Sequence, residues 1–122
     1  MSKNILLVDD DEEILYCYQM LLENDQIELF SAVNAEDALD ILREVNIDVA
    51  ILDYMLPTCK GDRLAQLINE SYPGVVIFIV SGIYDVEEAL ASMDVHVKEV
   101  FKKPLDPDML EDLIMTECRI AH

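Results

Sequence analysis

The stretch VAILDYMLP, residues 49–57, runs four apolar residues straight into an aspartate and ends at a proline. A continuous apolar run of this length is typical of a parallel strand that is covered on both faces of its sheet. The residues VVIFIV (75–80) form a second run of this kind. A carboxylate beside such a strand costs free energy unless something compensates for its charge. The role of Asp53 therefore has to be inferred from the other residues of the chain.

Three further apolar runs predict strands at residues 4–8, 27–32 and 97–101. Segments with helical spacing lie between the runs, and the first of them has one apolar stripe: Ile14, Leu15, Tyr18, Leu21 and Leu22. Asn34 before AED and Asp106 before Pro107 are typical helix starts. Five strand–helix units with short links predict an α/β domain over residues 1–122, with a doubly wound parallel sheet.

Composition limits the classes of protein to which this chain can belong. Its 122 residues are 52% apolar, and no apolar run approaches the roughly 18 residues of a membrane span. The first residues, MSKNILLVDD, lack the features of a signal peptide, so a cytoplasmic location without membrane contact is expected. The three cysteines are irregularly spaced, which favours a reducing compartment over a disulfide framework or a zinc site.

The charge balance is strongly acidic, with 26 acidic residues against 8 Lys and Arg and a formal net charge of −18. Proteins that bind nucleic acid use Lys and Arg to neutralise phosphates, so direct nucleic-acid binding is not expected. An acidic surface favours basic protein partners instead.

Polar side chains follow four of the five predicted strands. In open α/β sheets, ligands bind beyond the carboxyl ends of the strands, near the point where the strand order reverses. The residues at these ends are Asp9, Asp10 and Asp11 after the first strand, Asp53 after the third, Ser81 after the fourth, and Lys102, Lys103 and Pro104 after the fifth. Each signal alone has an ordinary interpretation as a cap, a turn or a surface residue, but together they predict one shared site.

The chemistry of this set fits phosphoryl transfer. Grouped carboxylates repel one another unless a cation binds, and hard oxygen ligands suit Mg²⁺. A carboxylate can also attack phosphorus to form an acyl phosphate. The transferring group spreads charge over three oxygens, which calls for the cation, Lys103 and the Ser81 hydroxyl around it.

Four motifs, LLVDDDEE, AILDYMLPTCKGDRL, IFIVSG and VFKKPLDPDML, occur in this order over essentially the whole chain. The chain thereby resembles the CheY-like receiver domain of two-component response regulators. The resemblance implies a flavodoxin-like sheet of five parallel strands in the order 2-1-3-4-5, with five helices. It also implies a signalling domain that catalyses its own phosphorylation and slow dephosphorylation but turns over no diffusible substrate.

The resemblance assigns a role to each matching residue. It implies that Asp53 is the phosphoacceptor, that Ser81 and Lys103 stabilise the phosphoryl group, and that a cis bond joins Lys103 to Pro104. The implied Mg²⁺ ligands are Asp9, Asp10, Asp53 and the backbone carbonyl of Met55. Asp11 falls one position past the metal pair, and we interpret it as a helix cap.

The resemblance also implies the partners. The phosphoryl donor would be a histidine kinase or a histidine phosphotransfer protein, received on the first helix, where Tyr16, Cys17 and Met20 are candidate contacts. The alternative for these three residues is a place in the core. The output would pass to a downstream protein or an output domain, through residues 84–117, and a homodimer through that face is possible in the family.

Val100 departs from the family pattern, because receivers commonly have an aromatic switch residue three positions before the lysine. Phe101 is adjacent, but strand alternation predicts that it points to the opposite face. This departure is the feature that favours an alternative function, a receiver-like interaction module that works without phosphorylation. A phosphatase of the haloacid dehalogenase type would need an aspartate at Met55, and an acidic first loop does not suit a flavodoxin-type cofactor.

Overall fold

The computed structural model describes residues 3–82, 91, 95–103 and 106–120. All five strands pair in parallel in the order β2-β1-β3-β4-β5, which confirms the predicted sheet. The strands are β1 (Lys3–Val8), β2 (Ile27–Ala32), β3 (Val49–Asp53), β4 (Val76–Ser81) and β5 (Glu99–Lys102). The prediction of a fifth strand at 97–101 was two residues early, because the ladder with β4 begins only where Glu99 lies opposite Phe78.

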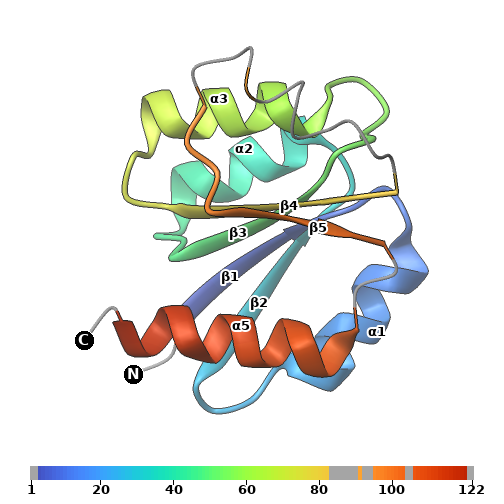
Figure 1. The fold of residues 1–122 in the computed structure, drawn as a ribbon, viewed down its shortest axis with the longest axis vertical. Helices are drawn as coiled ribbons and strands as arrows, with labels where there is room; N and C mark the ends of the chain where they lie inside the picture. Colours follow the sequence, from blue (N-terminus) through green and yellow to red (C-terminus); the bar gives the residue numbers. More distant parts are fainter. Residues whose placement is uncertain (1–2, 83–90, 92–94, 104–105, 121–122) are drawn as a thin grey trace.

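The helices cover both faces of the sheet (Figure 1). They are α1 (Glu12–Leu22), α2 (Ala35–Glu44), α3 (Gly61–Ser71) and α5 (Pro107–Ile120). Helices α1 and α5 lie on one face, and α2 and α3 lie on the other. The helix expected between β4 and β5 lies outside the described residues. Within the described part of the chain, no helix combines the length and the apolar character needed to span a bilayer.

The helix starts follow the predicted caps. The Asp11 carboxylate accepts hydrogen bonds from the backbone N–H groups of Glu13 (3.0 Å) and Ile14 (3.4 Å) at the start of α1. Asn34 accepts one from the Asp37 N–H (2.8 Å) at the start of α2. Such side-chain oxygens satisfy backbone N–H groups that have no partner inside the helix. Helix α5 begins at Pro107, directly after Asp106, as predicted.

Strand alternation divides the core into two layers. Leu6, Leu52 and Ile79 pack towards α2 and α3, whereas Leu7 and Ile51 pack towards α1 and α5. Most residues of β3 and β4 are buried, because each of these strands is covered on both faces.

Helix α1 has apolar residues on both of its faces. Leu15 and Leu22 are buried as predicted, but Leu21 is 60% exposed, so its assignment to the apolar core stripe was wrong. At about 100° per residue, Leu21 lies roughly a quarter turn from Leu22 and leaves the buried face. Together with the exposed side chains of Tyr16, Cys17 and Met20, Leu21 makes up what we call the outer face of α1.

Asn69 on α3 ties this helix to the segment before β5. Its side-chain oxygen accepts a hydrogen bond from the His96 backbone N–H (2.7 Å), and its amide nitrogen donates to the His96 carbonyl (3.2 Å). One side chain thus satisfies both backbone polar groups of a residue that precedes the strand.

Gly61, the first residue of α3, passes very close to the end of β3. A Cβ atom at position 61 would lie 2.8 Å from the carbonyl oxygen of Asp53 and 2.8 Å from the Cα of Tyr54. The Gly61 N–H also donates to the Tyr54 carbonyl (2.7 Å). Only glycine permits this approach, so Gly61 helps to fix the backbone that carries Asp53.

Gly61→Ala should lower the free energy of unfolding by about 1–3 kcal/mol, because rigid backbone atoms would have to move apart. Urea denaturation measures this change. Gly74→Ala is the matched control, because among the described residues no atom lies within 4 Å of the carbon it would add, and it should change stability by less than about 0.5 kcal/mol. Equal effects of the two substitutions would show that the close approach is unimportant.

Candidate functional site

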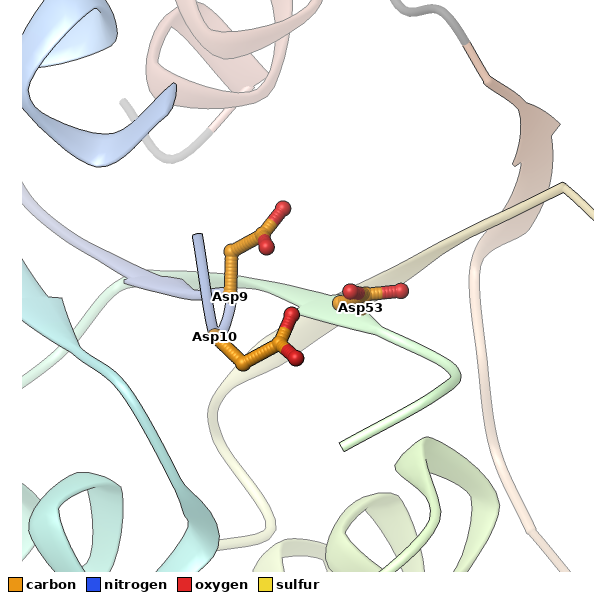
Figure 2. A group of neighbouring side chains, drawn as sticks. All are labelled: Asp9, Asp10 and Asp53. Carbon is orange, nitrogen blue, oxygen red and sulfur yellow. The ribbon is translucent and has the colours of Figure 1, made fainter. Parts of the chain in front are cut away.

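The sheet brings the first two predicted site positions together. Parallel pairing places Val8 opposite Leu52, so the residues that follow them along the chain, Asp9 and Asp53, lie side by side. Figure 2 shows Asp9, Asp10 and Asp53 gathered beside the ends of β1 and β3. The prediction that polar side chains converge at the carboxyl ends of the strands is met for these residues.

The three carboxylates form a group suited to a hard cation. One oxygen from each of Asp9, Asp10 and Asp53 lies within 4.8 Å of the other two. Around an octahedral Mg²⁺, neighbouring ligand oxygens are about 3 Å apart and opposite ones about 4.2 Å apart, so the three carboxylates would draw closer together on binding one ion. The donor set therefore fits Mg²⁺.

Lys103 brings a positive charge to this group from beyond β5. Its Nζ donates a hydrogen bond to Oδ2 of Asp53 at 3.0 Å and lies 3.6 Å from Oδ2 of Asp9. Its backbone N–H donates to the Ser81 carbonyl (2.9 Å), which holds the lysine at the end of the β4–β5 ladder. Burial lowers the pKa of Lys103, but the hydrogen bonds and charges of Asp53 and Asp9 together outweigh that effect, so its pKa is raised.

Asp53 is only 5% exposed at the end of β3. Its Oδ1 accepts a hydrogen bond from the Met55 N–H (3.2 Å), while Oδ2 is paired with Lys103. Both carboxylate oxygens thus have a donor. A buried carboxylate with these partners is held in a fixed position rather than left to solvent.

Asp9 is held by a local turn, in which its Oδ1 accepts a hydrogen bond from the Asp11 N–H (2.9 Å). The pKa of Asp9 is raised, chiefly because burial disfavours the charged form. The negative charges of Asp53 and Asp10 act in the same direction, whereas the Asp11 hydrogen bond and Lys103 act against it. The folded chain therefore holds Asp9 in a setting that opposes its ionisation.

The remaining predicted positions fall around this group. Ser81 is 1% exposed and ends β4, one residue beyond the partner of Asp53 in the ladder. Asp11 caps α1, as interpreted from the sequence. The role of the Met55 carbonyl as a ligand stays a prediction. Pro104, with its predicted cis bond, lies outside the described residues.

Val100 and Phe101 point to opposite faces of the sheet, as predicted. Val100 packs against the layer under α2 and α3, whereas Phe101 packs against the layer under α1 and α5. The rings of Phe101 and Phe78 are 5.9 Å apart between centroids. The β4–β5 register is regular through both residues, so no bulge brings Phe101 to the other face.

Sequence reasoning missed the contacts that shape the loop after Asp53. The Tyr54 hydroxyl donates to Oδ2 of Asp62 (3.3 Å), and the Lys60 Nζ lies 5.9 Å from the centroid of the Tyr54 ring. The close approach of Gly61 was missed as well. A glycine directly before a helical pattern was a signal for it, but the tyrosine contacts left no distinctive spacing.

Comparison with known proteins identifies the family. The model of the response regulator receiver domain matches residues 5–115. The chain belongs to this family. Receiver domains are signalling domains of two-component systems, and the acidic group described above lies where such domains typically bind Mg²⁺.

Relatives of this receiver domain include the regulatory protein VanR of Enterococcus faecium, which is 30% identical over 107 residues. That match covers 88% of the chain but 46% of VanR, so the chain spans less than half the length of this relative. Among solved structures, the CheY-like receiver domain protein of Methanospirillum hungatei has a TM-score of 0.85 at 28% identity. The signal receiver domain of an HD domain-containing protein from Pseudomonas fluorescens has a TM-score of 0.88 at 28% identity. In both, the alignment covers 98% of this chain and 96% of the other.

Asp9→Asn should raise the free energy of unfolding at pH 7 in the presence of a chelator, because the amide keeps the acceptor oxygen and removes the disfavoured charge. A raised pKa means that protonated Asp9 adds stability below its ordinary value of 3.8, and that this stability is lost as the pH rises through the folded value. The gain from the substitution should therefore be full at pH 7 and vanish below about pH 3.8. Urea denaturation across this range measures it, and a loss of stability at pH 7 would contradict the assignment.

Proposed function

We propose that this receiver domain accepts a phosphoryl group on Asp53 from a phosphohistidine of a histidine kinase or a phosphotransfer protein. The observation that carries the proposal is the position of the Asp53 carboxylate, nearly buried at a strand end, paired with Lys103 and grouped with Asp9 and Asp10. Burial alone would make this charge costly, and the proposed function gives a reason for it.

In the proposed reaction, a carboxylate oxygen of Asp53 forms a bond to phosphorus while the bond from phosphorus to the donor imidazole nitrogen breaks. The imidazole leaves with the bonding electron pair, and Asp53 becomes an acyl phosphate. Mg²⁺, held by Asp9, Asp10, Asp53 and the Met55 carbonyl, would supply positive charge to the phosphoryl oxygens.

Lys103 and Ser81 complete the proposed site. The Lys103 ammonium, now 3.0 Å from Oδ2 of Asp53, would transfer its interaction to a phosphoryl oxygen. The Ser81 hydroxyl would donate a hydrogen bond to another. The output would then pass to a downstream protein or output domain, where the exposed acids Asp108, Glu111 and Asp112 of α5 suit a basic partner surface.

The outer face of α1 is the proposed contact surface for the donor. Its exposed residues are Tyr16, Cys17, Met20 and Leu21. They follow the first turn of α1, whose N-cap is Asp11. Tyr16, Cys17 and Met20 are exposed and not in the core, which supports the proposed contact role for these three residues. An apolar helix face rimmed by acids suits an apolar partner surface rimmed by bases.

The first experiment is intact-protein mass spectrometry after incubation with acetyl phosphate and Mg²⁺. We expect a mass gain of one phosphoryl group, because the small donor needs only the site itself. Asp53→Asn should abolish the gain, and removal of the metal with a chelator should abolish it in the unaltered protein. A retained phosphoryl group in Asp53→Asn would place the acceptor elsewhere.

The same experiment distinguishes phosphoryl acceptance from the alternative function, a receiver-like interaction module. No mass gain from acetyl phosphate or from a phosphohistidine donor, with the fold shown to be intact by circular dichroism, would favour the interaction module. Val100 is the residue that favours the interaction module. It takes the place of the usual aromatic switch on the face of β5 that is covered by α2 and α3.

Met20→Asp on the outer face of α1 should slow phosphoryl transfer from a phosphohistidine donor by about tenfold, the effect of losing roughly 1.4 kcal/mol of binding free energy. Stopped-flow or quenched-flow assays of the transfer measure this rate. Phosphorylation of the same variant by acetyl phosphate is the internal control and should be unchanged. Equal slowing with both donors would show that the substitution damages the site rather than a docking surface.

A further inference from the structure

A cavity of about 440 Å³ lies between α1 and the sheet and opens beside the acidic group. Its apolar walls come from α1 and from three strands of the face that α1 covers: Leu7, Ile14, Leu15, Tyr18, Ile51 and Val80. Cavities of roughly 300–1,000 Å³ with mostly apolar walls and a few convergent polar groups are typical of small-molecule sites. The phosphoryl site does not account for the apolar walls.

The cavity changes from apolar to acidic along the strands. Leu7 and Asp9 are two residues apart at the end of β1, and Ile51 and Asp53 are two residues apart at the end of β3, so each pair projects from the same face of the sheet. Two residues of a strand span about 7 Å. An occupant would therefore meet apolar side chains at one end and carboxylates about 7 Å away.

The charged residues around the cavity determine whether a cationic or an anionic ligand could bind there. Among the described residues that line it, four are acidic, Asp9, Asp11, Glu13 and Asp53, and one is basic, Lys103. Lys103 pairs with Asp53 and lies 3.6 Å from Oδ2 of Asp9, so one ammonium group offsets only part of this negative charge. Asp11 caps α1, and Glu13 is exposed on the first turn of α1. An anionic ligand would be repelled, and a cationic group would find an acceptor.

We propose that this cavity binds a small organic cation, with its ammonium group at the carboxylates of Asp9 and Glu13 and a short hydrocarbon body against Leu7, Ile51 and Val80. The apolar part follows from the walls, since apolar cavities of even about 150 Å³ bind small hydrocarbons. A linear chain of about six carbons matches the 7 Å between the two ends.

This binding is separate from phosphoryl transfer, but the two sites share Asp9. A cation there competes with Mg²⁺ for the same carboxylate, so each should weaken the binding of the other by the same factor. The cavity would thus let a small amine oppose activation of the domain. Binding is measured on the unphosphorylated chain, so its failure and a failure of Asp53 phosphorylation are distinguishable.

The test is a titration of the full chain with hexylammonium at pH 7, followed by amide chemical shifts in two-dimensional NMR. We expect saturable shifts at Leu7, Ile51 and Val80, and a weaker apparent affinity when Mg²⁺ is added. Two control ligands should not produce these saturable shifts. Methylammonium lacks the hydrocarbon chain, and hexanoate has the opposite charge.

Two tryptophan substitutions on α1 form a matched pair. Ile14→Trp places bulk in the cavity and should abolish the saturable shifts, whereas Leu21→Trp on the outer face of α1 should leave them intact. Cys17 gives a second measurement that needs no variant, because it lies at the edge of the outer face of α1, where its exposed side chain also lines the mouth of the cavity. Cys59 is not among the residues that line the cavity. Hexylammonium should slow alkylation of Cys17 by iodoacetamide and leave Cys59 unchanged.

Several outcomes would overturn the proposal. Hexanoate binding as well as hexylammonium would refute the charge assignment, and an affinity that is insensitive to Mg²⁺ would refute the position of the ammonium group. Shifts confined to exposed acidic residues, or no protection of Cys17, would show that the cavity takes no such ligand.

Discussion

The parallel pairing of β1 with β3 is the constraint on which the site depends, because it forces Asp9 and Asp53 to lie side by side at the ends of adjacent strands. Two nearly buried carboxylates so close together repel each other, and the fold offsets this repulsion with one lysine from beyond β5. The site therefore draws on residues from the full width between β1 and β5. No local segment of the chain contains both the charges and their compensation.

The alternation of side chains divides this site between the two faces of the sheet. Asp53 and Phe101 belong to the side covered by α1 and α5, whereas Val100 belongs to the side covered by α2 and α3. Without an aromatic ring at Val100, the layer under α2 and α3 has a smaller side chain next to the end of β4. The aromatic contact of β5 is made instead with Phe78, in the opposite layer.

Local patterns in the sequence predicted much of this arrangement, because strand burial, helix caps and alternation depend on neighbouring residues. Asp11 as a cap and the opposed directions of Val100 and Phe101 are examples. Leu21 was assigned wrongly because a stripe of helical spacing does not show how wide the buried face is. The cavity under α1 depends on how far the helix stands from the sheet, and the contact of Gly61 with Asp53 depends on the path of a loop. Neither distance is encoded in the spacing of residue types.

The outer face of α1 has a consequence for the colloidal behaviour of the chain. A formal net charge of −18 makes two copies repel each other, and this long-range repulsion opposes contact between their apolar helices. Salt screens such repulsion over about 10 Å at 0.1 M. Rising ionic strength therefore favours self-association through the outer face, while it weakens attraction to any basic partner. High salt thus favours contact of this helix surface with a second copy of the chain, and low salt favours its contact with a partner of opposite charge.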